Sequence, residues 1–80
     1  MSAQDKILNV LSSVAETDEV KRDLELPLYD SHLLDSLKTV ELIIALADEL
    51  GVDISPAEIE REEWATPRKI VQYVEHKLAG

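Results

Sequence analysis

Apolar residues recur at helical spacing in three stretches of this 80-residue chain, with polar residues at the positions between them. The first stretch predicts an amphipathic helix over roughly 3–16, and the second predicts one over about 36–50. The third predicts a final helix that ends at about Leu78. The alternation typical of strands is missing, so the pattern predicts an all-α fold.

Turn residues mark the helix ends. Gly51 follows the second helix, where a left-handed backbone is favoured. Residues 55–58 (Ser-Pro-Ala-Glu) are typical of a capping box with proline at the first helical position, and they predict a short helix to about Glu62. Residues 66–67 (Thr-Pro) repeat this start signal before the last helix. We expect an all-α bundle of three longer helices and one short helix, with residues 1–80 as one domain.

A long connection, from about residue 17 to about 35, separates the first two long helices. Connections of this length are uncommon in compact domains unless they pack against the core or serve a function. Five spaced leucines predict that this one is held against the core: Leu24, Leu26, Leu28, Leu33 and Leu34.

The second helix has more apolar surface than a core requires. Its apolar positions cover an arc of roughly 220°, about twice the stripe of about 100° that faces a core. The residues expected to face inward are Leu42, Ile43, Leu46 and Leu50. The rest form a surface that we call the apolar ridge: Leu37, Val40 and Ile44. Beside acidic Glu41 and Asp48, this ridge suits transient docking. Alternatively, the long connection covers it.

The net charge of −9 comes from 17 acidic and 8 basic side chains. Between Asp35 and Glu63 there are nine acidic residues and two basic ones, which gives −7. Nucleic acid is therefore not expected as a partner, because binding phosphates needs clustered Lys and Arg. Basic protein surfaces suit this charge better. Without cysteine, a signal peptide or a transmembrane stretch, we expect a cytoplasmic monomer with no metal site.

Ser36 is the leading candidate for chemistry. It lies in residues 33–37 (Leu-Leu-Asp-Ser-Leu), where the polar connection meets the most hydrophobic helix. A hydroxyl at a helix start can carry a negatively charged group, because the first N–H groups are unpaired and the dipole is positive there. We interpret Ser36 as the attachment point of a phosphate-linked prosthetic arm. The alternatives are an N-cap serine or a serine behind an Asp35 cap.

Residues 34–37 (Leu-Asp-Ser-Leu) and 39–42 (Thr-Val-Glu-Leu) resemble the modification motif of acyl carrier proteins. The resemblance implies that Ser36 carries covalent 4′-phosphopantetheine, installed by a holo-carrier-protein synthase (a phosphopantetheinyl transferase). It also implies that Asp35 supports this modification. Leu37, Val40 and Glu41 match partner-contacting positions of that family, and Ile44 and Asp48 extend the same surface.

Residues 61–71 (Arg-Glu-Glu-Trp-Ala-Thr-Pro-Arg-Lys-Ile-Val) resemble a segment of the D-alanyl carrier proteins. This implies that the chain receives D-alanine from an adenylating ligase and holds it as a thioester. A membrane-bound acyltransferase would then use it to D-alanylate teichoic acids. Arg68 and Leu33 depart from the expected asparagine and glycine. A general or specialised acyl carrier of a fatty-acid, polyketide or other aminoacyl pathway therefore stays open.

Two other classes of function compete with a carrier protein. An enzyme would use His32, Asp35 and Ser36 as a nucleophilic set, but the chain lacks a Gly-x-Ser-x-Gly elbow and has little room for a pocket. An unmodified helical adaptor would bind one partner through the apolar ridge. Trp64 is expected to anchor the core or a loop, with its N–H hydrogen-bonded, and Thr66 to cap the last helix.

Overall fold

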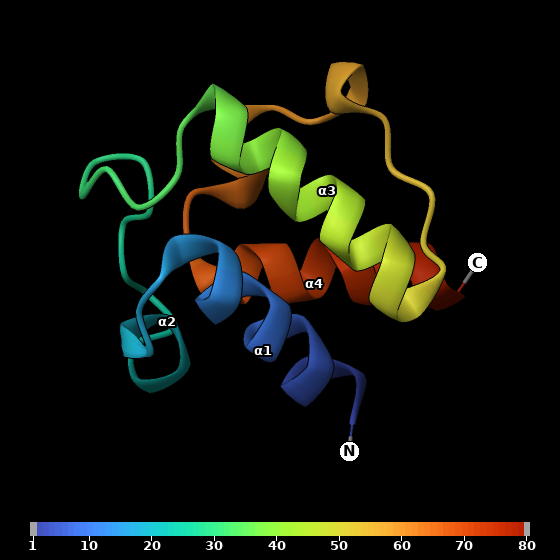
Figure 1. Ribbon diagram of the computed structural model, residues 1–80, viewed down its shortest axis with the longest axis horizontal. Helices are drawn as coiled ribbons and strands as arrows, with labels where there is room; N and C mark the ends of the chain where they lie inside the picture. The colour runs from blue at the N-terminus through green and yellow to red at the C-terminus, as the bar shows by residue number, and fades with distance from the viewer. Residues whose placement is uncertain (1, 80) are drawn as a thin grey trace.

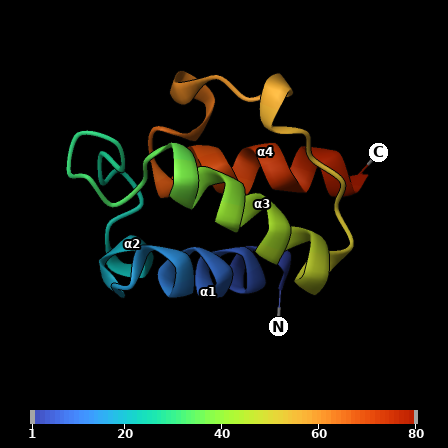
Figure 2. The same ribbon diagram turned by 45° about the horizontal axis from the view of Figure 1, so that its top comes forward.

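Three long helices dominate the computed structural model, which describes residues 2–79 (Figure 1). They are α1 (Ala3–Ala15), α3 (Ser36–Leu50) and α4 (Pro67–Ala79). Figures 1 and 2 show α1 and α4 side by side and antiparallel, with α3 crossing α1 at an angle. The described residues contain no strand, which confirms the all-α prediction. None of their helices is long and apolar enough to cross a membrane.

Three short elements complete the bundle: α2 (Glu19–Arg22) and the 3₁₀ turns η1 (Pro56–Glu58) and η2 (Arg61–Trp64). The prediction of one short helix to about residue 62 was wrong. Ile59 and Glu60 adopt extended backbone conformations, which split that segment into two turns. The sequence also gave no indication of α2, because a helix of four residues is too short to show a period.

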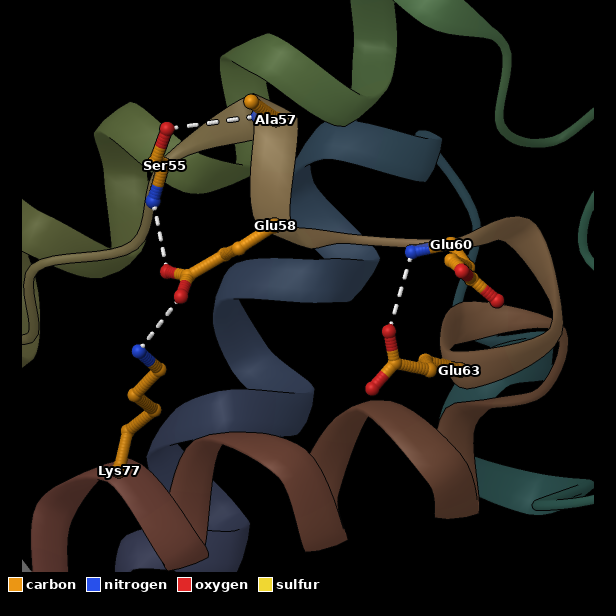
Figure 3. Close-up of polar contacts among 6 residues, drawn as sticks. All are labelled: Ser55, Ala57, Glu58, Glu60, Glu63 and Lys77. Atoms are coloured by element: carbon orange, nitrogen blue, oxygen red, sulfur yellow. Dashed lines mark hydrogen bonds and ion pairs between the residues drawn. The ribbon is translucent and has the colours of Figure 1, made fainter.

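The predicted capping box at the start of η1 is confirmed (Figure 3). The Ser55 N–H donates to Glu58 Oε1 at 2.8 Å, and the Ala57 N–H donates to Ser55 Oγ at 3.4 Å. Glu58 also accepts a hydrogen bond from Lys77 Nζ at 2.9 Å. This bond ties η1 to the last turn of α4, so the segment between α3 and α4 is held at its first turn.

Two further caps fix the rest of that segment. The Glu60 N–H donates to Glu63 Oε1 at 3.1 Å, which closes a second capping box around η2 (Figure 3). The sequence did not indicate it, because glutamate is not a favoured N-cap residue. Thr66 Oγ1 accepts the Lys69 N–H at 3.3 Å, so Thr66 caps α4 as predicted.

The long connection packs against the core, as predicted. Leu28 and Leu34 are buried, and the Leu28 N–H donates to the Ala65 carbonyl at 2.8 Å. The Arg68 N–H donates to the Leu24 carbonyl at 3.0 Å. The other leucines of the connection are half-buried: Leu24, Leu26 and Leu33. These two hydrogen bonds hold the connection against the segment that starts α4. The position of the first residues of α3 is therefore fixed as well.

Trp64 lies fully buried in the core, with its ring edge-to-face against Tyr73 at 5.9 Å between centroids. Its indole N–H has no hydrogen-bond partner within residues 2–79, so the prediction that this N–H is hydrogen-bonded was wrong. An unpaired buried donor costs about 1–3 kcal/mol. Burying a large aromatic surface offsets such a cost, which makes Trp64 an anchor of packing alone.

Candidate functional site

Ser36 is the first residue of α3, and Asp35 is the N-cap of this helix. The Asp35 carboxylate accepts the Lys38 N–H at 2.8 Å, and the Asp35 carbonyl accepts the Thr39 hydroxyl at 2.7 Å. Of the two structural roles considered for Ser36, the N-cap role therefore belongs to Asp35. Ser36 is exposed, and its hydroxyl makes no hydrogen bond within residues 2–79. The side chain is accessible for modification.

The backbone around Ser36 favours a negatively charged group. Within the described part of the chain, the N–H groups of Ser36 and Leu37 find no backbone acceptor. The positive end of the α3 dipole lies at the same place. An exposed hydroxyl, two unpaired N–H groups and a helix dipole together fit a phosphate attached to this side chain.

Lys38 follows Ser36 closely, but its charge is engaged elsewhere. Its Nζ donates to the Val14 carbonyl and to Glu16 Oε2, each at 3.0 Å. The hydrogen bond that Lys38 donates to the Glu16 carboxylate raises the pKa of Lys38 above its ordinary value. These contacts join α3 to the end of α1, so the Lys38 ammonium is paired with a carboxylate of another element.

A hollow of about 240 Å³, open to solvent, lies between the first turns of α3 and the η1–η2 segment. Its lining residues are Tyr29, Ser36, Thr39, Val40, Pro56, Ile59 and Arg61. The Tyr29 and Thr39 hydroxyls are hydrogen-bonded at 2.9 Å, and the Arg61 guanidinium lies 4.8 Å from the centre of the Tyr29 ring. Sequence reasoning missed Tyr29 and Arg61 as site residues, because nothing local in the sequence places them beside Ser36.

The apolar ridge is exposed, as predicted. Leu37 is 69% exposed, Val40 38% and Ile44 58%. Glu41 and Asp48, the predicted acidic neighbours, are also exposed. The predicted inward residues are buried except for half-buried Leu50: Leu42, Ile43 and Leu46. The alternative in which the long connection covers the ridge is therefore wrong.

The structure does not assemble the nucleophilic set that an enzyme would need. His32 is an exposed loop residue with a left-handed backbone, φ 62°. Within residues 2–79, no hydrogen bond joins its ring to Asp35 or to Ser36. The Asp35 carboxylate is committed to capping α3. These three residues are neighbours in sequence, yet among residues 2–79 no base is hydrogen-bonded to the Ser36 hydroxyl, as an activated nucleophile requires.

Comparison with known proteins agrees with this geometry. Residues 5–74 match the family model described as "Phosphopantetheine attachment site". The chain is similar to the D-alanyl carrier protein of Enterococcus faecalis, with 39% identity over 75 residues, 94% of this chain and 96% of that protein. The D-alanyl carrier protein of Lacticaseibacillus rhamnosus is 42% identical over 69 residues, 86% of this chain and 85% of that protein. The chain belongs to the D-alanyl carrier protein family.

As in other phosphopantetheine-binding proteins, the prosthetic group expected here is 4′-phosphopantetheine, linked covalently. The D-alanyl carrier protein of Listeria monocytogenes is a further relative, 37% identical over 75 residues, 94% of this chain and 96% of that protein. The exposed Ser36 hydroxyl and the two unpaired N–H groups beside it fit such a group. Ser36 also lines the solvent-open hollow of about 240 Å³.

Proposed function

We propose that this chain is the carrier that holds D-alanine as a thioester for the D-alanylation of teichoic acids in the cell envelope. Ser36 is the attachment site of the phosphopantetheine arm, and residues 1–80 act as one cytoplasmic carrier domain with no catalysis of its own. The main support is the free, exposed Ser36 hydroxyl at the start of α3, in a chain whose relatives are named D-alanyl carrier protein.

The arm supplies a thiol, which this cysteine-free chain lacks. The chain itself contributes the Ser36 oxygen that bears the phosphate and the helix start that stabilises its negative charge. An anion at a helix N-terminus gains about 0.3–1 kcal/mol. The Asp35 carboxylate opposes this gain, but its hydrogen bond to the Lys38 N–H directs it into the helix. Asp35 therefore caps α3 and leaves the exposed Ser36 hydroxyl accessible, and we assign it a supporting role in the modification.

The apolar ridge and its acidic neighbours form the surface that partner enzymes use. A holo-carrier-protein synthase, a D-alanine-activating ligase and a membrane-bound acyltransferase each need brief access to the same arm. Exposed Leu37, Val40 and Ile44 offer apolar contact, while Glu41 and Asp48 attract Lys or Arg on the partner. The arm on Ser36 tethers the cargo beside this surface, which raises its effective concentration at a docked enzyme, and a monomer is sufficient for this.

The site suits a short, charged cargo better than a fatty chain. The hollow beside Ser36 is open to solvent, and the hydroxyls of Tyr29 and Thr39 and the Arg61 guanidinium line part of it. A long acyl chain needs a sheltered apolar space, because its burial is what stabilises it. A D-alanyl group carries an ammonium and needs no such shelter. This difference favours D-alanine over a fatty acid as cargo.

Loading with each of several cargoes in separate reactions tests the proposal. The pantetheinylated protein is incubated with ATP, a D-alanine-activating ligase and, in turn, D-alanine, L-alanine, glycine or octanoate; a fatty-acyl ligase is tried in parallel. Intact mass reports thioester formation. The proposal predicts loading with D-alanine by the D-alanine-activating ligase. Loading by the fatty-acyl ligase alone would instead make the chain a fatty-acid carrier.

A further inference from the structure

The hollow beside Ser36 joins three parts of the chain. Ser36 and Val40 come from α3, Tyr29 comes from the long connection, and Ile59 and Arg61 come from the η1–η2 segment. Ser36 itself lines this hollow, so a group attached to its hydroxyl starts at the rim. Both apolar and polar side chains are present along the wall. The hollow therefore has the composition needed to hold a chain that carries a phosphate and amide groups.

A series of contacts fixes the Arg61 side of the hollow to the start of α3. The Thr39 hydroxyl bonds to the Asp35 carbonyl at 2.7 Å and to the Tyr29 hydroxyl at 2.9 Å. The Tyr29 ring then supports the Arg61 guanidinium, 4.8 Å from its centre. Thr39 lies one helical turn after Ser36 and on the same side of α3. Arg61 is thereby held near the attachment point from a distant part of the sequence.

Arg61 is the basic residue that lines this hollow. The ion pairs found within residues 2–79 involve Lys38, Arg68 and Lys77, and none involves Arg61. Arg61 is exposed and its guanidinium carbon lies over the Tyr29 ring. Guanidinium N–H groups can bind phosphate oxygens in a bidentate manner. The charge of Arg61 is thus available on the side of α3 from which the arm leaves.

We propose that Arg61 is a positioning residue for the phosphopantetheine arm. Its guanidinium pairs with the phosphate on Ser36 and favours a resting state in which the first part of the arm lies in the hollow, against Tyr29 and Val40. This inference rests on the proposed attachment at Ser36. An exposed ion pair shifts such an equilibrium by between about 1.4-fold and 5-fold, so the resting state stays easy for a partner to open.

Measuring the mobility of the arm in the pantetheinylated protein tests whether Arg61 positions it. The protein is pantetheinylated with a ¹³C,¹⁵N-labelled arm, and NMR then records the ³¹P shift, the heteronuclear NOE of the arm amides and NOEs from the arm to the Tyr29 ring. Arg61→Gln removes the charge. Arg61→Lys keeps the charge but loses the planar guanidinium, and Lys69→Gln is the control that removes an exposed positive charge away from the hollow.

In the unaltered protein we expect NOEs between the arm and Tyr29 and restrained arm amides. Arg61→Gln should move the ³¹P shift and weaken the NOEs by at most about 5-fold, because NOE intensity follows the populated fraction of the resting state. Arg61→Lys should keep more of the ³¹P effect than of the NOEs, and Lys69→Gln should change neither. Added salt should act like Arg61→Gln, since exposed charges are screened.

An arm as mobile in the unaltered protein as in Arg61→Gln would overturn the inference and leave the proposed function standing. Equal effects of Arg61→Gln and Lys69→Gln would also overturn it, because net charge alone would then explain the result. If no protein acquires the arm at all, the proposed attachment at Ser36 fails and the inference fails with it. Intact mass before each NMR measurement separates these cases.

Discussion

Shortening Ile44 to alanine should weaken partner docking while leaving the fold nearly intact. The substitution removes three carbon groups, each worth about 0.8 kcal/mol when fully buried. Ile44 is 58% exposed, so the surface available to a partner is worth at most about 1.4 kcal/mol. The remainder contributes about 1 kcal/mol to folding, and the higher helix propensity of alanine offsets a few tenths of that.

The assay compares the KM for modification by a phosphopantetheinyl transferase with the free energy of unfolding in urea. A loss of about 1.4 kcal/mol in docking corresponds to a rise in KM of about tenfold. Ile43→Val is a matched control, because Ile43 is 7% exposed and the change costs folding about 0.5–1.5 kcal/mol. It should destabilise the protein to a similar extent and leave KM unchanged.

The difference in KM between Ile44→Ala and Ile43→Val tests the docking role of the apolar ridge. Equal KM values for Ile44→Ala and the unaltered protein would refute the docking role of the apolar ridge. Equal rises for Ile44→Ala and Ile43→Val would also refute it, because loss of stability alone would then account for the effect.

Three further outcomes follow from individual contacts. Glu41→Lys should slow loading by the ligase several-fold at low salt, with little change in Tm; unchanged rates at every ionic strength would contradict this. The Lys77 hydrogen bond lowers the pKa of Glu58, so its stabilisation is present above the ordinary carboxyl pKa and is lost as pH falls through the lowered one. The Tm gap between the unaltered protein and Lys77→Met should therefore close in acid, and a constant gap would contradict this. Trp64→Phe should cost within about 1 kcal/mol, since it removes the unpaired N–H, whereas Trp64→Ala should cost about 3–5 kcal/mol; equal costs would contradict the difference.

The long helices could be predicted because their signals are local. Gly51 ends α3 with φ 68°, and the Thr66 cap starts α4, as each residue type favours. The division of α3 into an inward and an outward side also followed from the sequence. Its apolar arc was too wide for one core contact, so part of it had to stay exposed.

The remaining features depend on contacts between distant residues. No periodic pattern predicts that Arg61 stacks on Tyr29, because the pairing requires the η1–η2 segment and the long connection to meet. The split into η1 and η2 depends on the extended Ile59, which a helical pattern does not reveal. The unpaired Trp64 N–H likewise depends on which side chains from distant parts of the sequence surround the ring, and no local pattern reveals that.

Intact mass after incubation with coenzyme A and a phosphopantetheinyl transferase tests the central claim most directly. The unaltered protein and Ser13→Ala, which removes an exposed hydroxyl of α1, should each gain the mass of one phosphopantetheine. Ser36→Ala should gain none while keeping the same helical circular dichroism spectrum. Modification of Ser36→Ala, or failure of the unaltered protein to be modified by any competent transferase, would contradict the account.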